Sequence, residues 1–388
     1  MKPSLLSLFL LFLIPCLAFT QQVIPGGEQI AGYLPLLNGK RVAVVANASS
    51  VVGRNKVNLV DTMLSAGIQV VKIFCPEHGF RTYTDAGENI DDSFDKVTKL
   101  PVVSLYGKKK KPVAGDFEGV DLLVFDLQDV GVRFFTYIST LTYVMEACAE
   151  NNIPLMVFDR PNPNGYYIDG PVMEPGFSSF VGLHPVPVVY GMTIGEYARM
   201  VNGEHWLKSG QECLLTVIPL LNYTHSMTCP LPVKPSPNLP NSNAVLLYPS
   251  LCFFEGTVIS VGRGTCFPFE TFGHPDLRGF PFTFTPESIP GMSNHPPYEG
   301  RLCHGTDLRN YYSSSKPDRE LNLSWLISSY IAMGRKSGFF NDYFDKLAGT
   351  SSLRKQIMDG KSENQIRLSW QPGLEKFKII RSRYLLYP

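Results

Sequence analysis

The chain has 388 residues, 44% of them hydrophobic, and its 35 basic and 34 acidic side chains give a formal net charge of +1. This length allows two domains, each with its own core, and the balanced charge argues against a nucleic-acid partner. The one basic run, Lys108–Lys111, lies between Gly107 and Pro112. We interpret it as a solvated turn rather than a phosphate-binding patch.

The N-terminus has the pattern of a signal peptide. Lys2 precedes an apolar run over residues 5–19, and polar Gln21 and Gln22 follow. We therefore predict a signal peptide over residues 1–21 and an exported mature protein, periplasmic or secreted. Lipoprotein anchoring at Cys16 is disfavoured, because a proline precedes this cysteine and apolar residues follow it. No later apolar run reaches the roughly 20 residues of a membrane helix, so we expect no membrane insertion of the mature chain.

Short apolar runs alternate with helical patterns over the first 220 residues. Runs of this kind are typical of strands buried on both faces of a parallel sheet. The predicted strands are Val42–Ala46, Val70–Phe74, Val102–Tyr106, Leu122–Phe125, Leu155–Phe158 and Leu214–Pro219. Helices are predicted over Val57–Ala66, Tyr137–Asn151 and Met192–Gly203. Because such crossovers are right-handed, helices cover both faces, and the predicted fold is an α/β, Rossmann-like, doubly wound, mostly parallel sheet.

The second half of the chain has a different amino-acid composition. Pro230–Pro249 is crowded with proline and asparagine, which predicts an ordered extended loop rather than a helix. Val258–Val261 is a further predicted strand, and Leu321–Met333 a helix. We assign residues 22–270 to the Rossmann-like catalytic domain and residues 271–388 to a smaller C-terminal α+β auxiliary domain.

Four of the predicted strands end in polar clusters. Ligands bind beyond the carboxyl ends of the strands in an open parallel sheet, so these clusters are expected at one rim. They supply Asn47; Glu77 and His78; Asp126, Gln128 and Asp129; and Asp159, Arg160 and Asn164. This arrangement predicts an active site.

Glu77 is the leading candidate for a general acid. It follows a buried strand among apolar neighbours, and sheltered carboxyl groups serve as proton donors near neutral pH. His78 is compatible with orienting Glu77, with binding substrate or with a purely structural role. Asp126 and Asp129, with Gln128, are suited to a second catalytic carboxylate and to hydrogen bonds with sugar hydroxyls, although an aspartate at this place also caps its own loop. Glu88 is a further acid close in sequence.

Two arginines are candidates for binding a carboxylate. The guanidinium group has a fixed fork of donors that matches a carboxylate. Arg160 lies in the proline-rigid run Asp159–Gly165, and Arg263 lies in the turn Gly262–Thr265. An internal ion pair of Arg160 with Asp126 or Asp159 is an equally good reading.

These clusters resemble, in order and over nearly the whole mature chain, the exo-β-N-acetylmuramidase family, which was long known only as a domain of unknown function. The motifs that carry the resemblance are Cys75–Arg81, Asp126–Gly131, Tyr137–Leu141, Asp159–Gly165, Gly191–Glu196, Pro235–Pro240 and Ser260–Thr265. Family members often carry serine where this chain has Cys75. That change does not affect the neighbouring acid.

The resemblance implies release of N-acetylmuramic acid from the non-reducing ends of peptidoglycan fragments, in a cleft between a Rossmann-like domain and a smaller one. Muropeptides or MurNAc-GlcNAc saccharides would be the substrates, with no cofactor and no metal. Glu77 would be the general acid or acid/base. Asp126, Asp129 or Glu88 would be the second carboxylate, or would assist the substrate's acetamido group. The other expected substrate-binding residues are Asn47, His78, Arg81, Gln128, Tyr137, Asp159, Asn164 and Asn238, with Arg133, Arg160 or Arg263 for the lactyl carboxylate.

Three other functions remain open at this stage. A serine esterase lacks its Gly-x-Ser-x-Gly motif. A metal-dependent hydrolase using His78, Asp126 and Asp129 lacks a His-Glu-x-x-His motif and paired cysteines. A non-catalytic exported sugar-binding protein fits the same two-lobed architecture. A dinucleotide enzyme is disfavoured, because Asn47–Ser50 replaces the glycine-rich turn after the first strand.

Overall fold

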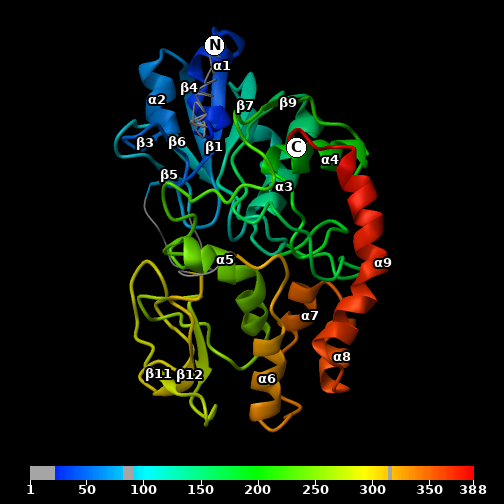
Figure 1. Cartoon of the computed structure of the whole chain (residues 1–388). Helices are drawn as coiled ribbons and strands as arrows, with labels where there is room; N and C mark the ends of the chain where they lie inside the picture. The colour runs from blue at the N-terminus through cyan, green and yellow to red at the C-terminus, as the bar shows by residue number, and fades with distance from the viewer. Residues whose placement is uncertain (1–21, 82–90, 209, 313–316) are drawn as a thin grey trace, which may run out of the picture.

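The computed structural model describes residues 22–81, 91–208, 210–312 and 317–388. The predicted signal peptide, together with Glu88, lies outside the described residues. The chain forms a larger lobe around a parallel sheet and a smaller lobe below it (Figure 1). The confirmed fold class is therefore α/β with a smaller C-terminal region.

The strands are β1 (Arg41–Ala46), β2 (Val51–Val52), β3 (Val57–Asn58), β4 (Gln69–Cys75), β5 (Ser93–Phe94), β6 (Pro101–Ser104), β7 (Leu122–Asp126), β8 (Leu155–Phe158), β9 (Leu215–Ile218), β10 (Thr271–His274), β11 (Phe282–Phe284) and β12 (Cys303–Asp307). The α-helices are α1 (Ile30–Leu37), α2 (Leu59–Ser65), α3 (Tyr137–Asn151), α4 (Ile194–Gly203), α5 (Ser242–Leu251), α6 (Ser324–Ala332), α7 (Tyr343–Ala348), α8 (Ser352–Met358) and α9 (Glu363–Ser382). Short 3₁₀ helices are η1 (Gly26–Glu28), η2 (Ala114–Phe117) and η3 (Cys252–Gly256).

The large sheet has the strand order β5-β6-β4-β1-β7-β8-β9, with every pair parallel except β5 and β6. The chain winds outward from β1 through β4 to β6 and then returns to β7 on the other side of β1. The strand order thus reverses between β1 and β7, which is the position where ligands bind in doubly wound sheets. Asn47, Glu77 and Leu127 follow the ends of β1, β4 and β7.

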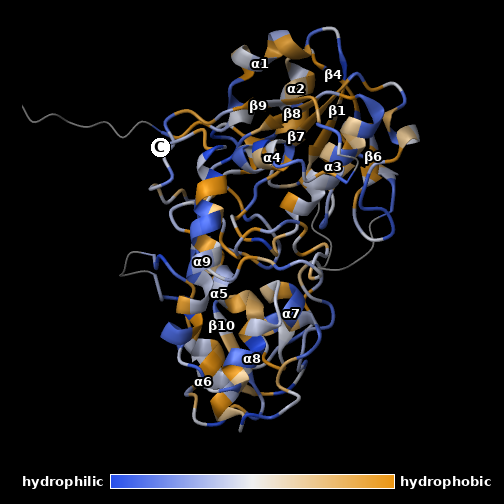
Figure 2. Ribbon diagram, turned by 90° about the vertical axis from the view of Figure 1, so that its right-hand side faces the viewer, coloured by the Kyte–Doolittle hydropathy of each residue, from blue (hydrophilic) through white to orange (hydrophobic). Residues whose placement is uncertain are grey.

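Helices cover both faces of this sheet because successive side chains point to opposite faces. Val42 and Val44 pack in the core that holds α1 and α2, whereas Ala43 and Val45 pack in the core that holds α3 and α4. Figure 2 shows the apolar strands at the centre of this lobe. The predicted strands from residue 42 to residue 219 are confirmed, with ends shifted by at most two residues.

Two predictions in the second half are wrong. Within the Pro230–Pro249 segment, α5 begins after Asn241, whose side chain accepts a hydrogen bond from the Ala244 N–H. Pro249 is tolerated in its last turn because the Val245 carbonyl, which loses its helical donor, accepts the Asn164 amide at 3.2 Å.

Val258–Val261 forms no strand. Ser260 makes a single antiparallel bridge with Gly273, and no named strand spans this segment. The hydroxyls of Thr257 and Ser260 accept backbone N–H groups two residues on. These local bonds compete with a sheet ladder.

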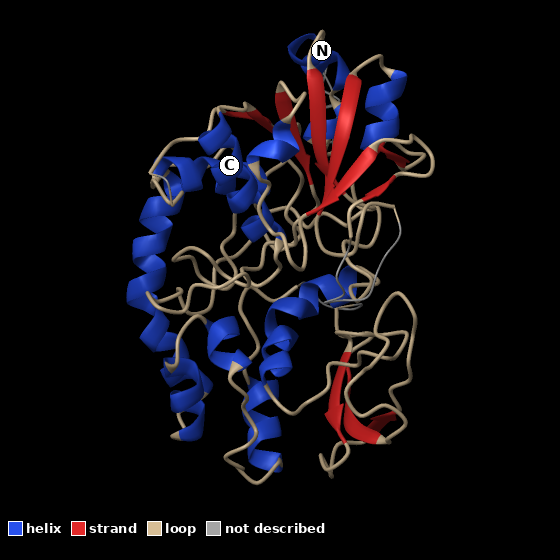
Figure 3. Cartoon of the chain, turned by 180° about the vertical axis from the view of Figure 1, so that it is seen from behind, coloured by secondary structure: helices blue, strands red, loops and turns tan. Residues whose placement is uncertain are grey.

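The smaller lobe contains the antiparallel sheet β10-β12-β11 and helices α6, α7 and α8 (Figure 3). Helix α9 runs along both lobes and returns the C-terminus to the larger one (Figure 1). There the Tyr387 hydroxyl donates to Asp159 at 2.6 Å, and the His225 N–H donates to the Pro388 carbonyl at 2.9 Å. These contacts hold the end of the chain, which follows α9, on the larger lobe.

Candidate active site

Glu77 lies directly after β4, in a tight turn whose backbone is unusual. The Gly79 N–H donates to the Pro76 carbonyl at 3.2 Å, and both His78 and Gly79 have positive φ, 74° and 80°. Glycine adopts this conformation freely, but for His78 it costs about 1–2 kcal/mol. Backbone strain of this kind is characteristic of functional sites, where the surroundings enforce it.

The partly buried Glu77 carboxylate is held by hydroxyl donors. The Thr136 hydroxyl donates to Glu77 Oε2 at 3.4 Å, and the Tyr106 hydroxyl also hydrogen-bonds this carboxylate. Burial, and next the neighbouring Glu77, raise the pKa of Tyr106. Tyr106 therefore keeps its proton and acts as a hydrogen-bond donor at neutral pH.

Glu77 faces a cleft with a volume of about 760 Å³, which is large enough for a sugar unit and its neighbours. Both lobes contribute to it. The larger lobe supplies aromatic and polar groups, and the smaller lobe supplies Tyr343 and Lys346 from α7.

A recess of about 70 Å³ adjoins the cleft and shares Glu77 and Arg263 with it. His78, Tyr137 and Asn238 line this recess. The His78 ring lies 3.3 Å from the Ser236 hydroxyl, and the Asn238 amide donates to the Met292 carbonyl at 2.9 Å. The structure thus brings these three predicted residues together beside Glu77. Asn47 lies one layer behind, where its amide donates to the Tyr137 hydroxyl at 2.7 Å.

Arg263 lines the cleft but already has a carboxylate partner. Its Nε and Nη2 atoms each lie 2.7 Å from Glu255 Oε1, and its guanidinium lies over the Phe269 ring. Glu255 also lines the cleft, so it is a second carboxylate near Glu77 that sequence reasoning missed. It follows an apolar run, as Glu77 does, but in a 3₁₀ helix rather than after a strand.

Asp126 and Arg160 form a buried ion pair outside the cleft. Arg160 Nε and Nη2 donate to the two Asp126 oxygens at 2.6 and 2.7 Å, and both side chains are almost fully buried. Neither residue lines the cleft or its recess. The prediction that Asp126 acts on substrate, or that Arg160 binds a lactyl carboxylate, does not fit this placement. The alternative reading, an internal ion pair, does.

Asp129 and Asp159 are likewise buried away from the cleft. Asp129 accepts the Tyr190 hydroxyl and the Gly131 N–H, and Asp159 accepts Thr193, Gly195 and Tyr387 donors. Burial raises the pKa of each carboxyl to about 6, against the partial compensation of these hydrogen bonds. Both side chains anchor loops instead of facing substrate, so the catalytic role predicted for Asp129 does not fit its position.

The raised pKa of Asp129 predicts a pH-dependent effect of Asp129→Asn. The folded state keeps the Asp129 proton up to about pH 6, whereas the unfolded chain loses it near pH 4. This carboxyl therefore lowers the free energy of unfolding by about 3 kcal/mol as pH rises through that window. Asparagine does not titrate, so the variant does not lose this stability as pH rises, and its amide oxygen can still accept the hydrogen bond from the Gly131 N–H.

Urea unfolding of both proteins between pH 4 and pH 7.5 measures the effect. The stability of the variant relative to the wild type should rise up to about pH 6 and then level off. Asp159 titrates in both proteins, so its contribution cancels. A difference that stays constant across the whole pH range would contradict the assignment.

The remaining predicted residues have structural partners. Arg133 is fully buried and donates to four backbone carbonyls, two of which belong to Leu347 and Ala348 on the smaller lobe. Burial lowers its pKa to about 9. Arg81 forms bidentate pairs with Asp61 and Asp95.

The buried amides of Gln128 and Asn164 also serve the structure. Each donates to two backbone carbonyls, Gln128 to those of Asp129 and Pro161 and Asn164 to those of Val130 and Val245. These predicted substrate contacts therefore join loops to one another.

Several residues of the cleft carried no local sequence signal. They are Tyr106, Thr136, Phe180, Tyr248, Glu255, His295, Tyr343 and Lys346. Most come from loops and helices far from the strand ends, so only the tertiary fold brings them to Glu77.

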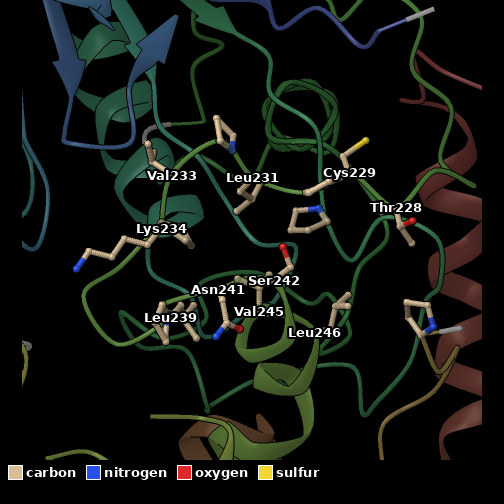
Figure 4. Close-up of a pocket in the computed structure, with 16 residues that line it drawn as sticks. Thr228, Cys229, Leu231, Val233, Lys234, Leu239, Asn241, Ser242, Val245 and Leu246 are labelled. Atoms are coloured by element: carbon tan, nitrogen blue, oxygen red, sulfur yellow. The ribbon is translucent and has the colours of Figure 1, made fainter. Parts of the chain in front are cut away.

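The proline-rich segment before α5 separates the recess from another cavity of about 390 Å³. Ser236 and Asn238 face the recess, whereas Pro235 and Val233 line the other cavity. Figure 4 shows the segment from Thr228 to Lys234 arching over the start of α5. This cavity is lined mainly by proline and aliphatic side chains. The prolines stiffen the segment that presents Asn238 to the recess.

The fold and the cleft define a two-lobed α/β enzyme with a carboxyl group beside the switch point of its sheet. The chain belongs to the exo-β-N-acetylmuramidase NamZ family, whose N-terminal model matches residues 42–243 and whose C-terminal model matches residues 246–387. The family models divide the chain between residues 243 and 246. Our boundary at residue 270 stays a prediction.

Similar proteins span almost the whole chain. The peptidoglycan β-N-acetylmuramidase NamZ of Bacillus subtilis (strain 168) is 38% identical over 375 residues, which is 92% of this chain and 89% of the relative. A DUF1343 family protein from Bacteroides fragilis NCTC 9343 has a crystal structure with 44% identity and a TM-score of 0.86, covering 95% and 99% of the two chains. A second crystal structure of that family and organism has 27% identity and a TM-score of 0.78, covering 94% and 99%.

The described residues contain neither a membrane-spanning helix nor a cluster of metal ligands. No helix among them is long and apolar enough to cross a membrane. Within the same residues, no three His, Cys, Asp or Glu side chains gather in a way that could hold a metal ion.

Proposed function

We propose that this protein is an exo-acting β-N-acetylmuramidase that releases N-acetylmuramic acid from the non-reducing ends of peptidoglycan fragments, in cell-wall turnover or recycling. Membership of the NamZ family and the peptidoglycan β-N-acetylmuramidase of B. subtilis support this activity. Muropeptides or MurNAc-GlcNAc saccharides are the proposed substrates. The N-terminal pattern supports export to the periplasm or medium.

The position of Glu77 is the observation that carries the proposal. Hydrolysis of a glycoside requires a proton on the leaving oxygen and a water molecule at C1. Glu77 follows β4 at the edge of the sheet where ligands bind and faces the cleft, and Tyr106 and Thr136 orient its carboxyl group, so we assign the proton transfer to it. The C1–oxygen bond then breaks, water adds its hydroxyl to C1 of the released sugar, and the other proton of that water restores the acid form of Glu77.

Glu255 is suited to a supporting electrostatic role. Its carboxylate lines the same cleft, and Arg263 fixes its orientation. A negative group at this place stabilises positive charge that develops at C1 as the bond breaks.

Product analysis with a synthetic MurNAc-GlcNAc disaccharide tests the proposal. Free N-acetylmuramic acid should appear, and NMR spectra taken in the first minutes report its anomeric configuration. With a longer glycan, only the terminal sugar should be released. Binding without cleavage would instead support a sugar-binding protein, and internal fragments would contradict exo action.

A further inference from the structure

N-acetylmuramic acid differs from N-acetylglucosamine by a lactyl ether that carries a carboxylate. A cation within reach of this group would favour the former, because charge-assisted hydrogen bonds to a carboxylate are the strong ones. Of the three predicted arginines, Arg133 is buried away from the cleft among carbonyls, and Arg160 is paired with Asp126 outside the cleft. Arg263 reaches the cleft, but its Nε and Nη2 atoms already bind Glu255.

The basic run Lys108–Lys111 supplies a cation instead. Lys109 pairs with Asp116 at 3.2 Å, and Lys111 pairs with Glu150 at 2.7 Å. Lys110, in contrast, lines the cleft that contains Glu77. Among the residues that the structure describes, none places a carboxylate within ion-pair distance of Lys110. The interpretation of the whole run as a solvated turn is therefore wrong for this lysine.

Aromatic contacts fix Lys110 on the same wall as Glu77. Its ammonium nitrogen lies 4.4 Å from the centre of the Phe180 ring, which stacks on Tyr143 with ring centroids 6.0 Å apart. The Phe180 ring centroid also lies 6.4 Å from that of Tyr106, which hydrogen-bonds Glu77. Since C1 and C3 belong to one sugar ring, the proton donor for the glycosidic oxygen on C1 and the cation for the C3 substituent must lie on neighbouring parts of one site.

We propose that Lys110 binds the lactyl carboxylate of the terminal N-acetylmuramic acid and so determines the preference for this sugar over N-acetylglucosamine. The inference rests on the proposed function. Lys110 is partly buried, so its ion pair with a bound carboxylate is better shielded from water than one made by Lys346, which lines the same cleft but is exposed. Phe180 holds the ammonium in place before substrate arrives.

The test compares Lys110→Gln with Lys109→Gln, a matched change in the adjacent lysine that lies outside the cleft. The substrates are a β-MurNAc glycoside and its analogue with a lactyl carboxamide. Lys110→Gln should lower kcat/KM for the acid about 10- to 100-fold, mainly through KM, and leave the carboxamide rate unchanged. Lys109→Gln should behave as the wild type on both.

The outcomes separate the two proposals. Equal losses on both substrates, no loss for Lys110→Gln, or a selective loss for Lys346→Gln in its place would overturn the assignment of Lys110. Failure of the wild type to cleave the acid would count against the proposed function instead. Titration with free N-acetylmuramic acid measures binding without turnover. Lys110→Gln should weaken this binding by the same factor, and unchanged affinity would overturn the lysine's role.

Discussion

Replacing Glu77 by glutamine is expected to slow the release of N-acetylmuramic acid from a disaccharide by about 100- to 10,000-fold. The amide has nearly the shape of the carboxyl and still accepts hydrogen bonds from Thr136 and Tyr106. It cannot give a proton to the glycosidic oxygen. Steady-state release of the free sugar measures the loss, and circular dichroism and thermal unfolding check that the fold is retained.

The nature of the leaving group gives a sharper readout of the same change. A p-nitrophenyl glycoside needs little protonation of its leaving oxygen, so Glu77→Gln should lose much less activity on it than on a disaccharide. A purely structural defect would lower both rates equally.

Asp129→Asn is the matched control for Glu77→Gln, because it neutralises a buried carboxyl outside the cleft. The Asp129→Asn variant should retain activity. Near-normal turnover by Glu77→Gln would eliminate the role of Glu77 as the acid. A comparable loss of activity in Asp129→Asn would instead indicate that the buried carboxylate takes part in catalysis.

The sheet was predictable because its evidence is local. Uninterrupted runs such as Val42–Ala46 and Leu155–Phe158 lie in strands buried on both faces. The capping pair of Thr193 and Glu196 marks the start of α4. Helix α9 was harder to recognise, because most of its residues are polar. Its buried face consists of only four apolar side chains, Ile366, Trp370, Leu374 and Phe377.

The site was only partly predictable, because polar residues at strand ends divide into two groups. Glu77 ends a strand next to the switch point and faces the cleft. Asp159 ends β8, where Thr193 and Tyr387, far away in sequence, cover its carboxylate. Sequence shows that both acids follow strands. Only the packing of distant segments shows which one keeps access to substrate.

Asp126→Asn is expected to lower the free energy of unfolding by about 3–5 kcal/mol. The substitution leaves the Arg160 guanidinium buried without an anionic partner, because the Val51 carbonyl is its other side-chain hydrogen-bond acceptor among the described residues. Asp121→Asn is the control, since Asp121 makes the same bidentate contact with Arg41 at the exposed surface. Water stabilises the separated charges there, so this change should have little effect.

Urea unfolding of the two single variants and of the double variant Asp126→Leu/Arg160→Met separates the causes. Removing both charges avoids an unpaired buried ion, so the double variant should recover most of the stability lost in Asp126→Asn. If the double variant is as unstable as the single one, the ion pair itself rather than the stranded guanidinium holds the loops together. Equal losses for Asp126→Asn and Asp121→Asn would contradict the view that burial makes the Asp126–Arg160 pair structural.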